Sequence, residues 1–137
     1  MPMVECFAAS RPQEGRSTNE DAFLLALRAD PPWVAVCDGA GQAQQAARRV
    51  LRLFERLIAE AESQAVTAFP TWARWVRTLD SALREGAEST LVAVATLEDR
   101  IAGTCVGDSR AYLWSRDGEL RILTDGASRF RLGSRRR

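Results

Sequence analysis

The sequence of 137 residues contains no histidine. This absence excludes Ser-His-Asp and Cys-His catalysis, imidazole-bound zinc and a histidine general base from the reactions that the chain can perform unaided. Catalysis would have to use carboxylates, arginine and bound ions. Cysteine is also scarce. Cys6, Cys37 and Cys105 are odd in number, widely spaced and set among apolar residues, which indicates buried thiols rather than a disulfide framework.

Neither sign of charge predominates, and long hydrophobic runs are missing. The 19 basic and 18 acidic residues give a formal net charge of +1, so no overall field favours nucleic acid. The arginine-rich residues 129–137 are a local exception that either holds a phosphate or forms a solvated end. No apolar run is as long as a membrane span, and the first residues do not resemble a signal peptide. We therefore expect a cytoplasmic protein without a nucleic-acid or membrane partner.

The composition is that of an ordinary globular protein, with 46% apolar and 27% charged residues. A chain of this length is expected to form one domain, residues 1–137, around a single core. Short apolar runs between turn signals predict strands, and apolar residues at helical spacing predict two helices between them. The predicted elements are strands at 4–8, 22–27 and 33–37, helices from about 42 to 61 and from 70 to 86, and strands at 91–97, 101–106, 110–115 and 119–123.

The order of these elements predicts the fold class. Hairpin turns join the last strands, and neighbours joined by a hairpin cannot be parallel. Strands, two helices and further strands therefore indicate an α+β layered domain with mainly antiparallel sheets. Trp72 and Trp75 share the apolar stripe of the second helix, so we expect them in the core. Asp117 and Gly118 are a hairpin signal without a further role.

Residues 38–41 (Asp-Gly-Ala-Gly) directly follow the apolar run 33–37. The glycines permit a tight turn, and Gly39 leaves its carbonyl open to a ligand. Hard divalent cations such as Mg²⁺ and Mn²⁺ take carboxylate and carbonyl oxygens, so Asp38 and Gly39 are a chemically sensible pair. A strand, an Asp-Gly turn and a capped helix would give the same pattern without any metal.

A second acidic pair, Glu20 and Asp21, stands at the entry to the strand predicted at 22–27. Two carboxyl groups that point into one site repel each other unless a cation neutralises them. A solvated acidic turn is the alternative. Arg16 precedes this pair in a Gly-Arg-Ser-Thr loop, and its guanidinium either binds a phosphate or pairs with Glu20.

Asp108 lies between two predicted strands in residues 107–110 (Gly-Asp-Ser-Arg). Its carboxylate either joins an ion or caps the turn through its own backbone. No one of these acidic turns is diagnostic by itself.

Four segments occur in a fixed order. They are residues 16–21 (Arg-Ser-Thr-Asn-Glu-Asp), 38–41 (Asp-Gly-Ala-Gly), 88–91 (Glu-Ser-Thr-Leu) and 106–113 (Val-Gly-Asp-Ser-Arg-Ala-Tyr-Leu), with Leu-Thr-Asp following at 123–125. Together they resemble the type 2C, or PPM, family of metal-dependent serine/threonine protein phosphatases in its bacterial form, although residues 88–91 depart from the usual Gly-Thr-Thr. The resemblance implies a layered α-β-β-α sandwich of antiparallel sheets flanked by helices.

The resemblance also implies roles for individual residues. Asp38 would bridge two Mn²⁺ or Mg²⁺ ions, and Gly39 would supply a carbonyl to one of them. Glu20 and Asp21 would hold metal-bound waters, and Asp108 would contribute to a third, weaker metal site. Arg16 would bind the substrate phosphate, which makes Arg16 and Asp38 the implied catalytic residues. The implied reaction is hydrolysis of a phosphomonoester by a metal-activated water, and the implied partners are a phosphorylated protein substrate and a cognate Ser/Thr kinase in signal transduction.

Family members continue through a Ser-Asp-Gly strand and a late Asp-Asn pair, each with a metal-binding aspartate, whereas this sequence stops at residue 137. The resemblance therefore implies an incomplete sandwich, with metal ligands missing and with sheet edges uncovered for self-association. Two hypotheses compete. The chain is a phosphatase, or it is a truncated or non-catalytic regulatory module that binds a phosphorylated partner through Arg16. The number of carboxylates that reach the metals separates them.

Overall fold

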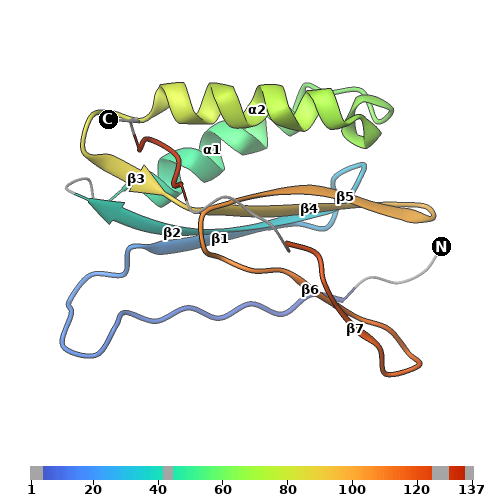
Figure 1. The fold of residues 1–137 in the computed structure, drawn as a ribbon, viewed down its shortest axis with the longest axis horizontal. Helices are drawn as coiled ribbons and strands as arrows, with labels where there is room; N and C mark the ends of the chain where they lie inside the picture. Colours follow the sequence, from blue (N-terminus) through green and yellow to red (C-terminus); the bar gives the residue numbers. More distant parts are fainter. Residues whose placement is uncertain (1–4, 42–44, 125–129, 135–137) are drawn as a thin grey trace.

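The computed structural model describes residues 5–41, 45–124 and 130–134. Its main sheet is antiparallel, and two helices cover one face of it (Figure 1). The α+β class with mainly antiparallel sheets is thus confirmed. In spatial order the sheet contains β1 (Asp21–Ala26), β2 (Trp33–Gly41), β4 (Leu91–Leu97) and β5 (Arg100–Val106), and β3 (Ala87–Ser89) pairs with the end of β2. The helices are α1 (Ala46–Ala59) and α2 (Phe69–Ala82). A short 3-10 turn at Ala65–Thr67 separates them.

The core lies between the helices and the sheet. The apolar stripe of α1 buries Val50 and Phe54 fully, as its helical spacing predicts. Phe54 stands at the centre of an aromatic cluster in which its ring centroid lies 5.1 Å from Trp33 and 5.9 Å from both Trp72 and Trp75. The expectation that these two tryptophans are core residues is confirmed. Among the described residues, no helix has both the length and the apolar character to cross a membrane.

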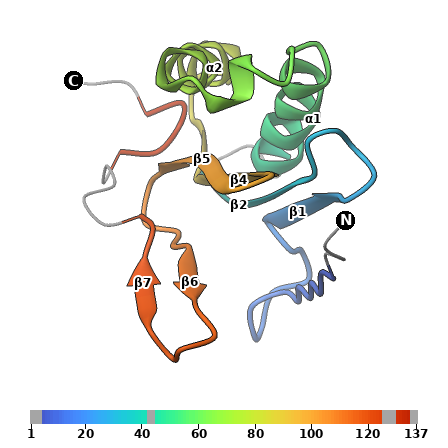
Figure 2. The same ribbon diagram turned by 90° about the vertical axis from the view of Figure 1, so that its right-hand side faces the viewer.

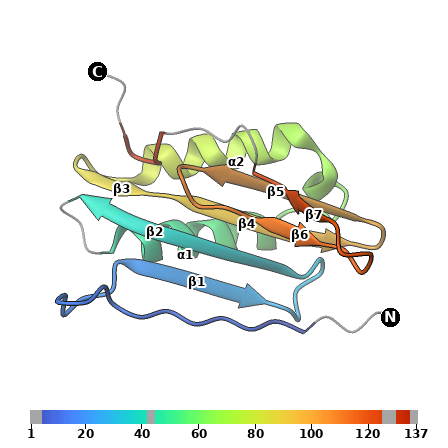
Figure 3. The same cartoon turned by 60° about the horizontal axis from the view of Figure 1, so that its bottom comes forward.

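On the opposite face of the sheet, the described part of the chain forms no helix, and a hairpin extends from it (Figure 2). Successive side chains of a strand point to opposite faces of the sheet. Ala35 is buried on the helical face, so its neighbour Val36 points to the uncovered face, as does Phe23, the register partner of Val36. Phe23, Val36 and Ile101 are 41%, 50% and 44% exposed. Figure 3 shows the order of the strands from this uncovered side.

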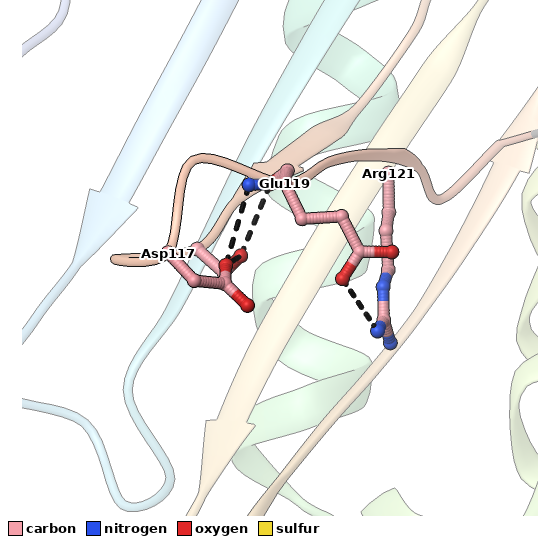
Figure 4. Close-up of polar contacts among 4 residues, drawn as sticks. Asp117, Glu119 and Arg121 are labelled. Atoms are coloured by element: carbon pink, nitrogen blue, oxygen red, sulfur yellow. Dashed lines mark hydrogen bonds and ion pairs between the residues drawn. The ribbon is translucent and has the colours of Figure 1, made fainter.

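The hairpin consists of β6 (Tyr112–Trp114) and β7 (Leu120–Ile122), which form a separate two-stranded sheet. Gly118 adopts φ +86°, and the Ser115 N–H donates to the Glu119 carbonyl at 2.9 Å, which closes the turn. Hydrogen bonds from Ser115 and from the Glu119 backbone hold the pKa of Asp117 below its usual value. Arg121 pairs with Glu119 at 2.9 Å (Figure 4). The turn predicted at residues 117 and 118 is confirmed as a structural feature.

The sequence-based boundaries differ from the structure at several points. Residues 5–8 form no strand, so the first predicted strand is wrong, and residue 4 lies outside the described residues. The predicted turn at residues 38–41 is also wrong, because β2 continues through Gly41 and pairs there with β3, a strand that the sequence reasoning missed. α1 begins at Ala46, and the helix start predicted near residue 42 falls partly outside the described residues.

The three cysteines are free thiols. Cys37 is buried, whereas Cys6 and Cys105 are partly exposed, so the expectation of buried thiols holds fully only for Cys37. Burial raises the pKa of Cys37 to about 12, and its hydrogen bond with Ser89 offsets only part of that effect. Cys37 is therefore protonated and unreactive at neutral pH.

Candidate active site

Two of the predicted metal ligands, Asp21 and Asp38, face each other across neighbouring strands. They are register partners in the β1–β2 ladder, and partners in a ladder project their side chains to the same face. Both alternate with helix-facing residues, so both carboxyl groups lie on the uncovered face of the sheet. Burial is the main cause that raises the pKa of Asp38, and the hydrogen bond and negative charge of Asp21 raise it further. The pair is electrostatically unfavourable without a proton or a cation between the two groups.

Gly39 allows Glu20, which directly precedes β1, to lie against β2. Its N–H donates to the Glu20 carbonyl at 3.0 Å. A Cβ at position 39 would lie 2.7 Å from that same carbonyl oxygen, so a larger residue would push the two segments apart. Gly39 does not have a positive φ. Its small size is needed for close approach rather than for the tight turn that the sequence suggested.

A threonine that the sequence reasoning did not single out fixes the backbone of Asp38. The Asp38 N–H donates to Thr90 Oγ1, and the Thr90 N–H donates to the Asp38 carbonyl, both at 2.9 Å. Thr90 is fully buried, and its Oγ1 also lies 2.7 Å from Ser109 Oγ. This chain of hydrogen bonds links β2 to the loop that carries Asp108. The sequence did point to both residues, since Thr90 lies in the segment 88–91 and Ser109 in the segment 106–113.

Gly107 sets the start of that loop. It has φ +98°, and a Cβ there would lie 2.7 Å from Thr90 Cγ2. Asp108 follows with its side chain 70% exposed, and its negative charge contributes to the raised pKa of Asp38. The structure therefore places Asp108 within electrostatic range of the Asp21–Asp38 pair.

Arg131 is a site residue that the sequence reasoning assigned only to an arginine-rich end. Its Nη2 lies 3.9 Å from Asp108 Oδ2, and its positive charge lowers the pKa of Asp38. Residues 125–129, which lie between β7 and Arg131, are outside the described residues, as are residues 135–137. A contact over such a sequence separation has no local pattern, so only the fold could show it.

Arg16 forms the predicted ion pair with Glu20, and its phosphate-binding role stays a prediction. Its Nη1 lies 3.4 Å from Glu20 Oε2, and its side chain is 58% exposed. Asn19, which the sequence reasoning overlooked, accepts a hydrogen bond from the Asp21 N–H at 3.1 Å and donates to Ser10 Oγ at 2.7 Å. These bonds orient the entry to β1, and the exposed Arg16 remains free to exchange Glu20 for another anion.

The donor chemistry of this region fits a hard divalent cation in part. Asp21 and Asp38 supply carboxylate oxygens on one face, the oxygen ligands that Mg²⁺ and Mn²⁺ accept. In the part of the chain that the structure describes, however, no three carboxylate or thiol groups come together as a metal-binding group. Glu20 and Asp108 flank the pair without completing such a group. The roles predicted for Glu20, Asp21, Asp38, Gly39 and Asp108 remain predictions.

Comparison with known proteins adds a family match. The family model of protein phosphatase 2C matches residues 10–130. A search of curated protein sequences gave no match.

Three solved structures of similar fold are described as phosphatases. The catalytic domain of the serine/threonine protein phosphatase PstP, solved with two manganese ions, is 27% identical with a TM-score of 0.65, and the match covers 80% of this chain and 50% of that one. The PstP/Ppp phosphatase of Mycobacterium tuberculosis is also 27% identical, with a TM-score of 0.63 and coverage of 80% and 49%. A bacterial serine phosphatase with an arginine-to-alanine mutation is 20% identical, with a TM-score of 0.68 and coverage of 88% and 60%, a likeness that concerns the fold alone. The chain spans about half the length of the PstP structures.

Proposed function

Because this chain belongs to the protein phosphatase 2C family, we propose that it carries part of the active site of a metal-dependent phosphatase that acts on phosphoserine and phosphothreonine in proteins. The observation that carries the proposal is the cross-strand pair of Asp21 and Asp38 on the uncovered face of the sheet. PstP, solved with two manganese ions, supports the choice of metal. The phosphorylated protein substrate, a cognate kinase and a cytoplasmic location are parts of this proposal.

Asp38 and Asp21 would hold Mn²⁺ or Mg²⁺, with Glu20, Gly39 and Asp108 at its periphery. A bound ion of this kind lowers the pKa of a coordinated water and withdraws charge from the phosphoryl oxygens. The raised pKa of Asp38 supports this assignment, because a cation would relieve the repulsion that Asp21 imposes on it.

The arginines of the chain would bind the phosphate. Arg16 is exposed, and among the described residues its ion pair is the one with Glu20 at 3.4 Å, so the planar guanidinium can turn to a phosphate at little cost. Arg131 lies beside Asp108, and its positive charge acts on Asp38. A phosphate between these two guanidinium groups would have its negative charge neutralised from two directions.

A second function is favoured by the lack of a three-carboxylate group among the described residues. In this alternative the chain binds a phosphorylated partner through Arg16 without turnover. Mn²⁺-dependent hydrolysis separates the two, because the alternative has no turnover.

The test measures Mn²⁺ binding by titration calorimetry and Mn²⁺-dependent hydrolysis of p-nitrophenyl phosphate for the chain and for Asp38→Asn. Asp99→Asn serves as the matched control, because Asp99 is exposed at the β4–β5 turn and, within the described ranges, pairs with its neighbour Arg100 alone. We expect Mn²⁺ binding and hydrolysis that Asp38→Asn abolishes and Asp99→Asn preserves. Folded chain that binds no Mn²⁺, or binds it equally well in both variants, would refute the proposed centre. Mn²⁺ binding without hydrolysis would favour the non-catalytic alternative for this chain.

A further inference from the structure

A groove of about 470 Å³ lies on the helical side of the protein, between α1 and the turn that joins α2 to β3. Its walls come from two separate parts of the chain, with α1 on one side and residues 83–87 on the other. Leu53 and Leu83 are apolar side chains in its lining. Five arginines line it: Arg48, Arg49, Arg52, Arg56 and Arg84.

The positive charge of this arginine groove is uncompensated. No aspartate or glutamate lines the groove, and none of the five arginines forms an ion pair within residues 5–41, 45–124 and 130–134. Arg49, Arg52 and Arg56 follow one another at helical spacing on one face of α1. Like charges held so closely repel each other, so the arrangement would be stabilised by an anion.

One of the guanidinium groups is already held in place. Arg49 Nε donates to the Ala82 carbonyl at 3.1 Å, which ties α1 to the end of α2 and leaves the Nη atoms of Arg49 for a ligand. Arg48 and Arg52 also border a second cavity, along β1, to which Asp21 contributes. Arg56 and Arg84 border the arginine groove, one from each wall, and neither lines the cavity along β1.

The chemistry of the groove selects one class of ligand. All 19 basic residues of the chain are arginine, and the planar guanidinium pairs with two phosphate oxygens at once, which ammonium does not. The volume is in the range that small-molecule sites occupy, about 300–1,000 Å³. The chain as a whole has a net charge of only +1, so the local excess is not part of a basic surface suited to nucleic acid.

We propose that the arginine groove binds a small anion that carries two or more phosphate groups. The groove lies on the helical side of the sheet, whereas the carboxyl groups of Asp21 and Asp38 face the uncovered side. It is therefore a second anion site, and it does not depend on the proposed phosphatase activity.

The test is calorimetric titration of the metal-free chain, in the presence of EDTA, with inorganic pyrophosphate. The variants are the double substitution Arg56→Gln with Arg84→Gln, the matched control Arg74→Gln on the exposed side of α2, and Arg16→Gln in the candidate active site. Far-UV circular dichroism of each variant checks that the helices remain. Titration with a glutamate decapeptide tests whether the groove prefers a carboxylate-rich segment.

We expect saturable pyrophosphate binding that the double substitution weakens about tenfold or more, since charge-assisted hydrogen bonds are lost from both walls. Arg74→Gln should bind as the parent chain does, Arg16→Gln should keep the binding that the double substitution weakens, and added salt should weaken that binding. No binding, or equal binding by the folded double variant, would overturn the proposal. It would also be overturned if Arg16→Gln alone lost pyrophosphate, or if the decapeptide bound more tightly than pyrophosphate.

Discussion

Replacing Thr90 by valine should loosen the backbone of Asp38 without opening a cavity. Thr90 is fully buried, and valine has nearly the same shape, so the packing contribution is conserved. The Asp38 N–H would lose the Thr90 Oγ1 acceptor at 2.9 Å, and Ser109 Oγ would lose its partner at 2.7 Å. Leaving a buried N–H without an acceptor costs about 1–3 kcal/mol. We therefore expect Thr90→Val to lower the free energy of unfolding by about 2 kcal/mol.

Two further variants show which bond matters. Ser109→Ala removes only the contact between the two hydroxyl groups, and it should cost about 0.5–1 kcal/mol, since Ser109 is partly exposed and can be solvated. Thr78→Val makes the same chemical change on an exposed helical threonine, whose hydroxyl bonds only to the Arg74 carbonyl one turn earlier. It should stay within about 0.5 kcal/mol of the parent chain.

The assay is urea unfolding followed by tryptophan fluorescence, with the four tryptophans as the probe. The Mn²⁺ affinity of Thr90→Val should fall as well, because Asp38 would no longer be held in register. A Thr90→Val chain as stable as Thr78→Val would refute the reasoning that the hydroxyl anchors the candidate active site. Equal costs for Thr90→Val and Ser109→Ala would place the anchor in the Ser109 contact instead.

Two other predictions follow from burial and close approach. Cys37 has a pKa raised from 9.0 to about 12 in the folded chain, so the unfolded chain loses its thiol proton first. The contribution of the Cys37 thiol proton to stability is fully present below pH 9. The free energy of unfolding should then fall by about 1.4 kcal/mol per pH unit between about pH 9 and 12. Burial also raises the pKa of Cys105, so urea unfolding at several pH values should show a steeper fall in the parent chain than in Cys37→Ala, and parallel slopes would contradict the prediction. Gly39→Ala places a Cβ 2.7 Å from the Glu20 carbonyl oxygen and should cost about 1–3 kcal/mol by overpacking, which an unchanged urea midpoint would disprove.

The helices and the central strands were predictable because their patterns are local. Val50 and Phe54 recur at helical spacing and are buried as that spacing requires, and β4 occupies the predicted residues 91–97. β3 was missed because three residues carry no recognisable alternation. The extension of β2 through Gly41 was missed because Asp-Gly-Ala-Gly has the composition of a turn, and only pairing with β3 makes it a strand.

Some residues of the candidate site were likewise predictable from local sequence, and others were not. The order of the acidic segments located Asp21 and Asp38, and the fold placed them opposite each other. The Arg16–Glu20 pair was foreseeable because it joins residues four apart in the sequence. Thr90 and Arg131 were not, since their contacts with Asp38 and Asp108 depend on how distant segments pack.

The register of β1 and β2 also limits how the gene can change. Asp38 and Cys37 are adjacent, and successive residues of a strand point to opposite faces. Deletion or insertion of a single codon between Trp33 and Cys37 would turn the Asp38 carboxylate into the core and the Cys37 thiol outward. Because a buried, unpaired carboxylate is costly, selection should remove in-frame insertions and deletions of one residue from this segment. Length variation among descendants of this chain should therefore collect in the loops, while β2 changes only by substitution.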